Sequence, residues 1–154
     1  MKKAILIGAT SGIGLEVARL LAQQGYMVGI AGRRVERLVE IAKSTANITV
    51  YRQIDITDAS ATKLLHELIA ELGGMDLYFH SSGIGWENCE LDIDREMKTV
   101  ETNGVGFTRM VTAAFRWFAD NNRGGQIACI TSIARTRGLG AAPAYSATKR
   151  FPSH

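Results

Sequence analysis

The chain has 154 residues, of which 46% are hydrophobic and 21% charged, as in a single soluble domain with a sizeable core. Its formal charge of +3 is too small and too scattered to indicate a nucleic-acid partner. No apolar run approaches the roughly 18 residues of a membrane helix, and the apolar run at 4–7 is too short for a signal peptide, so we expect a cytoplasmic protein without a membrane partner.

Short β-rich runs alternate with amphipathic stretches along the chain. Strands are predicted at 3–8, 26–32, 48–55, 75–83 and 125–134. Helices are predicted at 13–24, 35–44 and 58–73, the last capped by Asp58 and ended by Gly73. A long helical region follows from about 93 to 121, with a break expected near Asn103, and a short helix begins at Ala144.

The pattern of apolar residues predicts the buried helix faces and the fold class. Ile13, Val17, Leu20 and Leu21 share a face of the first helix, and Val35, Leu38, Val39 and Ala42 point inward from the second. Strand–helix alternation implies right-handed crossovers and a parallel sheet covered on both faces. We therefore predict a single doubly wound α/β domain over residues 1–154, a three-layer αβα Rossmann fold.

A glycine-rich turn, Gly8-Ala9-Thr10-Ser11-Gly12-Ile13-Gly14, joins the first strand to the first helix. Glycines let the backbone turn tightly and let a pyrophosphate approach without a Cβ in the way. The helix N-terminus that follows supplies unpaired amide donors. An ordinary βα turn is the alternative interpretation. The spacing Gly-x-x-x-Gly-x-Gly resembles the cofactor motif of the short-chain dehydrogenase/reductase family.

The end of the second strand indicates which dinucleotide is bound. NAD-binding folds usually place an acidic side chain here, but this chain has Arg33 and Arg34, and Glu36 comes later, inside the helix. Guanidinium groups bind phosphate through bidentate, charge-assisted hydrogen bonds. The alternative is that both arginines are solvated at a helix start. Because a Gly-Arg pair at this place is associated with NADP in the family, the resemblance implies NADP (NADPH) as the cofactor.

Two later segments extend the resemblance. It implies that Asp55, which is followed by Ile56, hydrogen-bonds the adenine amino group, although Asp55 also suits a turn or a cap. The family's Asn-Asn-Ala-Gly is replaced here by His80-Ser81-Ser82-Gly83. The predicted cofactor-binding residues are Gly8, Thr10, Ser11, Gly12, Ile13, Gly14, Arg33, Arg34, Asp55, Ile56, Ser82, Gly83, Tyr145 and Lys149.

Tyr145 and Lys149 form the second motif. Four residues apart on a helix, they share a face, and a nearby ammonium favours the phenolate form of a tyrosine. Ser132 stands 13 residues before Tyr145, at the end of the predicted fifth strand. Asn103 alone suits a helix break or cap. In this order and spacing, Asn103, Ser132, Tyr145 and Lys149 resemble the family's catalytic set.

The resemblance implies hydride transfer between a nicotinamide and a small-molecule carbonyl or alcohol. It implies that Tyr145 exchanges the substrate proton and that Ser132 polarises the carbonyl oxygen. It also implies that Lys149 holds the nicotinamide ribose, while Asn103 supports a water that links Lys149 to solvent. The two cysteines and three histidines show no ligand spacing, so no metal is expected.

The match to the family ends at Arg150, and Pro152 disfavours a helical Phe151. We therefore expect a C-terminally truncated member that lacks the family's last strands. Its fifth strand then becomes a sheet edge, and its long helix leaves Phe107, Met110, Val111 and Phe115 uncovered, which predicts a homo-oligomer. An active NADP(H)-dependent oxidoreductase is the first hypothesis. The alternatives are a catalytically inactive dinucleotide-binding remnant and a protein-interaction fragment built on the bare sheet edge.

Overall fold

The computed structural model describes residues 1–84, 88–132 and 140–150. Within them, five parallel strands form one sheet in the order β3-β2-β1-β4-β5. The strands are β1 (Lys3–Ile7), β2 (Met27–Gly32), β3 (Ile48–Gln53), β4 (Leu77–His80) and β5 (Gln126–Cys129). The helices are α1 (Gly12–Gln23), α2 (Val35–Ser44), α3 (Ala61–Leu72), α4 (Ile93–Val100), the π-helix η1 (Glu101–Gly106), α5 (Phe107–Asp120) and α6 (Pro143–Thr148).

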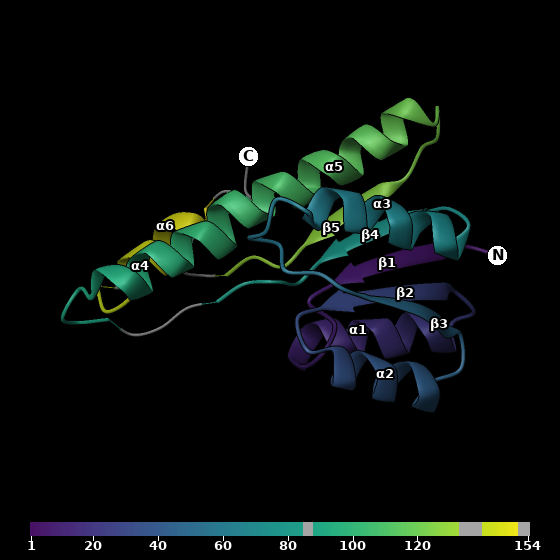
Figure 1. Cartoon of the computed structure of the whole chain (residues 1–154), viewed down its shortest axis with the longest axis horizontal. Helices are drawn as coiled ribbons and strands as arrows, with labels where there is room; N and C mark the ends of the chain where they lie inside the picture. The colour runs from purple at the N-terminus through teal and green to yellow at the C-terminus, as the bar shows by residue number, and fades with distance from the viewer. Residues whose placement is uncertain (85–87, 133–139, 151–154) are drawn as a thin grey trace.

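Helices cover the sheet on both faces, with α1 and α2 on one side and α3 and α5 on the other (Figure 1). Ala4, Ile5, Leu6 and Ile7 of β1 are all fully buried, because a central parallel strand meets helices on each face and needs apolar side chains on both. The predicted three-layer, doubly wound α/β fold is confirmed. Among the described residues, no helix combines the length and the apolar character that crossing a membrane requires.

Of the four residues predicted for the buried face of α1, Val17 and Leu21 are half-buried against the core, whereas the prediction was wrong for Ile13 and Leu20. Gly14, Leu15, Ala18 and Ala22 are the buried residues, whereas Ile13 is 58% exposed and Leu20 is 54% exposed. The small side chains of Gly14, Ala18 and Ala22 let α1 approach the sheet closely, and Ile13 and Leu20 lie outside this contact. In α2, the inward position of Leu38 is confirmed, and the second fully buried residue is Ile41.

The start of α3 also differs from the prediction. The helix begins at Ala61 with Ser60 as its N-cap residue. Asp58 lies in the turn before the helix, where its side chain accepts a hydrogen bond from the Ser60 amide at 2.9 Å. The predicted end is confirmed, because Gly73 adopts a left-handed φ of 87° at the C-cap.

The long helical region is continuous, and the break predicted near Asn103 is the π-helix η1 between α4 and α5. A Cβ at Gly106 would lie 2.7 Å from Ile56 Cγ1, so the glycine permits close packing there. The expectation that Met110 is uncovered was wrong, because Met110 is fully buried in the core that α3 and α5 share, while Phe115 is 65% exposed.

Candidate functional site

A cavity of about 610 Å³ lies at the carboxyl ends of the strands, at the point where the chain order reverses between β1 and β4. Open α/β sheets bind ligands at such switch points. The described lining includes most of the predicted cofactor residues: Gly8, Thr10, Ser11, Gly12, Ile13, Arg33, Arg34, Asp55, Ile56, Ser82 and Gly83. Gly32, Ile54, Ser81, Ile84, Thr102 and Ile130 also line it and were not predicted.

Two glycines of the turn are required by packing. Gly8 has a φ of +82°, and a Cβ there would lie 2.6 Å from the Ser82 amide nitrogen. A Cβ at Gly14 would lie 2.3 Å from the Gly8 carbonyl oxygen. At Gly12, by contrast, an added Cβ would meet nothing within 4 Å. Gly8 and Gly14 therefore allow the turn to pack closely against the end of β4, whereas Gly12 leaves the cavity side of the turn open.

The first turn of α1 faces this cavity without a side-chain cap. Ser11 is the N-cap residue, and its side chain makes no capping hydrogen bond. The early amides of a helix have no partners within the helix, and its N-terminal end carries partial positive charge. Because Ser11, Gly12 and Ile13 all line the cavity, this end of α1 is suited to an anionic group.

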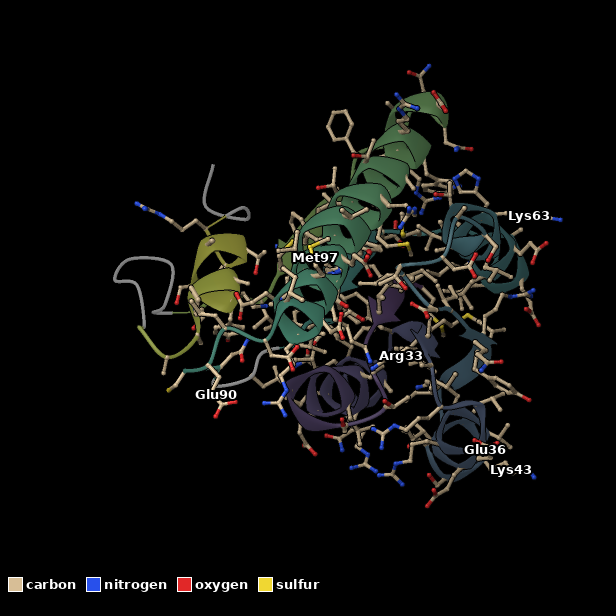
Figure 2. The ribbon with its side chains drawn as sticks, turned by 60° about the vertical axis from the view of Figure 1, so that its left-hand side comes forward. Arg33, Glu36, Lys43, Lys63, Glu90 and Met97 are labelled. Carbon is tan, nitrogen blue, oxygen red and sulfur yellow. The ribbon has the colours of Figure 1, made fainter. Side chains whose placement is uncertain are left out.

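Guanidinium groups border the cavity next to the turn. Arg34 donates a hydrogen bond from Nη2 to Thr10 Oγ1 at 3.0 Å, and Arg37 donates from Nε to the Thr10 carbonyl at 3.3 Å. Arg33 lines the cavity, whereas Glu36 lies away from it on α2 (Figure 2). The contact of Arg37 was not predicted, although its place one helical turn after Arg34 was a usable signal.

Asp55 lies at the edge of the cavity and also holds a turn, the second of the roles considered for it. It lines the cavity, and its Oδ1 accepts hydrogen bonds from the Thr57 amide at 3.0 Å and from the Thr57 hydroxyl at 2.7 Å. The bond from the Thr57 hydroxyl is the main cause that lowers the pKa of Asp55. The carboxylate is therefore ionised and held in a fixed orientation at the edge of the cavity.

Lys149, Asn103 and Gly83 meet at the other end of the cavity. A Cβ at Gly83 would lie 2.9 Å from Lys149 Nζ and 3.3 Å from Asn103 Oδ1. The buried Asn103 side chain is fixed by the backbone of Ile84, accepting from its amide at 2.8 Å and donating to its carbonyl at 2.6 Å. Lys149 Nζ is 5.7 Å from the centre of the Tyr145 ring, so the two side chains share a side as predicted.

A buried imidazole stands beside this cluster. His80 is 3% exposed, its Nδ1 shares a hydrogen bond of 2.8 Å with the Tyr78 hydroxyl, and its ring meets Phe107 edge to face. Its Nε2 has no hydrogen-bond partner among the described residues. Burial, and next the Lys149 ammonium, lower the pKa of His80 to about 4, so the imidazole is neutral near pH 7.

The other predicted residues lie outside the cavity or outside the residues that the structure describes. β5 ends at Cys129, so Ser132 lies three residues past the strand, half-buried. Of the predicted fifth strand, positions 133–134 lie outside the described residues, as do Phe151 and Pro152. The predicted residues missing from the described lining of the cavity are Gly14, Asn103, Ser132, Tyr145 and Lys149, although Asn103 and Lys149 lie next to Gly83 at its end.

The strand order, the glycine turn after β1 and the cavity at the switch point are the arrangement of the doubly wound Rossmann class of α/β folds. The sequence profile of the short chain dehydrogenase family matches residues 2–153. The chain belongs to this family.

Curated relatives and solved structures agree with this assignment. An uncharacterized oxidoreductase of Myxococcus xanthus is 34% identical over 158 residues, which cover 99% of this chain and 62% of the relative. An NADP-dependent 3-hydroxy acid dehydrogenase of Escherichia coli is 30% identical over 96% of this chain and 60% of its own length. An actinorhodin polyketide ketoreductase solved with NADPH has a TM-score of 0.86 at 28% identity, covering 97% of this chain and 60% of that one. The chain thus spans about 60% of the length of these proteins.

Proposed function

We propose that this chain binds NADP(H) in the cavity and transfers hydride between its nicotinamide and a carbonyl or alcohol substrate. One observation carries the proposal: a single cavity runs from Arg33 and Arg34 past the glycine turn to Gly83, and Lys149 lies at Gly83. The relatives named NADP-dependent and the ketoreductase solved with NADPH support the choice of cofactor.

The residues present fit a phosphorylated dinucleotide. The volume of about 610 Å³ falls within the range of about 300–1,000 Å³ for small-molecule sites. In the proposed arrangement, the α1 amides hold the pyrophosphate and Arg33 and Arg34 hold the 2′-phosphate. The bond from Arg34 to Thr10 occupies only one of the five donors that a guanidinium offers. Asp55 takes the adenine amino group, and Lys149 takes the nicotinamide ribose.

The proposed mechanism gives each side chain one task. Bound NADP(H) supplies or accepts the hydride. The Tyr145 hydroxyl gives a proton to the substrate oxygen or takes one from it, and the adjacent Lys149 ammonium stabilises the phenolate left behind. Ser132 donates a hydrogen bond to the same oxygen. Asn103, fixed by Ile84, maintains the polar surroundings of Lys149.

Fluorescence titration with NADPH and with NADH tests the cofactor assignment. A charge-assisted bond contributes about 1.5–3 kcal/mol, so Arg33→Ala is expected to weaken NADPH binding by roughly ten- to a hundredfold and to leave NADH binding unchanged. Lys43→Ala, at the exposed end of α2, is the matched control. Equal affinity of the unsubstituted protein for NADPH and NADH would refute the role of the arginines.

A turnover assay with NADPH and a panel of carbonyl compounds tests catalysis. Tyr145→Phe removes the only proton that the side chain can exchange, so turnover should fall by at least about a hundredfold while NADPH binding persists. Tyr51→Phe, at a half-exposed site on β3, is the control. NADPH binding without turnover in the unsubstituted chain would instead identify a dinucleotide-binding remnant.

We also propose that the chain forms a homo-oligomer. Met97, Val105 and Phe115 are 50%, 50% and 65% exposed along the long helical region of α4, η1 and α5, and Met97 stands out from α4 (Figure 2). Several large apolar side chains exposed along one helical region are typical of protein–protein contact surfaces.

A further inference from the structure

The helix that carries Tyr145 has little to fix its own N-terminus. α6 has only six residues, begins with Pro143, and is preceded by Ala142, which makes no side-chain cap. Helices this short are unstable without tertiary contacts. α6 lies beside α4 at a distance from the helices that cover the sheet (Figure 1). The position of Tyr145 therefore depends on how α6 is attached to α4.

Glu96 of α4 makes that attachment at the first turn of α6. Its Oε2 accepts a hydrogen bond from the Ala144 amide at 3.0 Å, and its Oε1 accepts one from Asn88 Nδ2 at 3.0 Å. The Ala144 amide is one of the early helix amides that lack a partner inside the helix. A carboxylate from another helix thus serves as the cap, one residue before Tyr145.

Asn88 holds the same segment from the other side. Its backbone amide donates to the Ala141 carbonyl at 2.6 Å. Its buried side chain donates to the Asp92 carbonyl at 2.9 Å and accepts from the Asp92 amide at 2.9 Å. Both amide hydrogens and the carbonyl oxygen of Asn88 are therefore engaged, which fixes Asn88 to the start of α4.

We infer that Asn88 and Glu96 form a clamp that positions Tyr145 for proton transfer by fixing residues 141–144 against α4. The inference rests on the proposed function for its catalytic consequence, but the clamp itself is measurable without turnover. Glu96 is a positioning residue, since it acts through the Ala144 amide. The described lining of the cofactor cavity does not include Glu96, and most of the proposed cofactor contacts lie outside α6. The clamp should therefore affect catalysis far more than cofactor binding.

Two substitutions of Glu96 compare the loss of both of its hydrogen bonds with the loss of one. Glu96→Ala removes both acceptors. Glu96→Gln keeps one acceptor oxygen and turns an NH₂ group toward either Asn88 or Ala144, so one of the two bonds is lost. Displacement of a catalytic group by about 1 Å can cost roughly a hundredfold in rate. We expect kcat to fall by about that factor in Glu96→Ala and by less in Glu96→Gln. Glu101→Ala, at an exposed position of η1, is the matched control.

Three measurements separate positioning from general stability and from the proposed function. NADPH titration should give a Kd that changes far less than kcat in every variant, because the proposed contacts of α1, Arg33, Arg34 and Asp55 with the cofactor lie outside α6. Amide hydrogen exchange at Ala144 should accelerate by about tenfold in Glu96→Ala, because its hydrogen bond to a charged acceptor is lost. The pH at which kcat falls by half should move in Glu96→Ala, because the Tyr145 hydroxyl shifts relative to Lys149, and should return toward the original value in Glu96→Gln.

Unchanged exchange at Ala144 in Glu96→Ala would overturn the clamp. Equal losses of kcat and of NADPH affinity would also overturn it, because they would show general unfolding. If the unsubstituted chain binds NADPH but does not turn over, the catalytic part of the proposed function fails, and faster exchange at 144–149 in Glu96→Ala still supports the clamp. If NADPH does not bind, the cofactor proposal fails and the same exchange comparison decides the clamp.

Discussion

Removing the imidazole of His80 should flatten the dependence of folding stability on pH. The ring is buried at the end of β4, where it bonds the Tyr78 hydroxyl and contacts Phe107. Burial is the main cause that lowers its pKa from 6.5 to about 4, and Lys149 is the next. Folding therefore opposes protonation of His80, and acid favours the unfolded chain.

The magnitude follows from the two pKa values. The folded value lies below the unfolded value, so this contribution to stability is complete above about pH 6.5 and is lost as the pH falls toward 4. The loss is about 2 kcal/mol at pH 5 and about 3 kcal/mol at pH 4. The lowered pKa values of Asp55, Asp58 and Asp76 act in the same direction, but mainly near and below the ordinary carboxyl value of 3.8.

Urea unfolding followed by circular dichroism between pH 5 and 7.5 measures this effect. His80→Asn should lower stability at pH 7.5, since it loses the ring contact with Phe107, and should lose most of the pH dependence. His66→Asn, on the exposed side of α3, should keep the dependence of the unsubstituted chain. A His80→Asn variant whose stability falls with pH as steeply as that of the unsubstituted chain would refute the reasoning.

Two further predictions concern the turn and the outer surface. Gly14→Ala should lower the midpoint of thermal unfolding by several degrees and weaken NADPH binding. Its Cβ would lie 2.3 Å from the Gly8 carbonyl oxygen, and overpacking costs about 1–3 kcal/mol. In the control Gly124→Ala, the added Cβ would meet nothing within 4 Å, so the unfolding midpoint and NADPH binding should both stay unchanged. Phe115→Glu should reduce the molar mass found by size-exclusion chromatography with light scattering, because it places a charge in an apolar contact surface, and a monomeric unsubstituted chain would contradict the proposed homo-oligomer.

The alternation of strands and helices could be predicted from the sequence because short β-rich runs, most apolar in the central strands β1 and β2, are separated by amphipathic stretches. The glycine turn could be interpreted because its position after β1 is fixed by that alternation, and eleven of the predicted residues do line the cavity. The buried face of α1 could be predicted only in part, because hydrophobicity also favours Ile13 and Leu20, whereas close packing on the sheet selects Ala18 and Ala22.

The contacts between distant segments were beyond the sequence as well. The local sequence pattern gives no sign that Glu96 contacts Ala144, which lies 48 positions away. A glutamate on the polar face of a helix gives the same pattern whether it is solvated or contacts another helix. Tyr145 and Lys149 were predictable for the opposite reason, since helical geometry alone places them on one side. The π-helix was expected only as a break near Asn103, because the residue types in 101–106 suit several kinds of helix irregularity.

The π-helix η1 sets the angular phase between α4 and α5. Each residue of an α-helix turns the chain by about 100°, and a π segment contains one residue more than regular winding requires. If residues 101–106 were wound as a regular α-helix instead, the extra residue would rotate α4 by about 100° relative to α5. Since α5 is anchored in the core, Glu96 would then face away from Ala144. The extra residue thus works as a rotational offset that directs α4 toward α6 while α5 remains packed on the sheet.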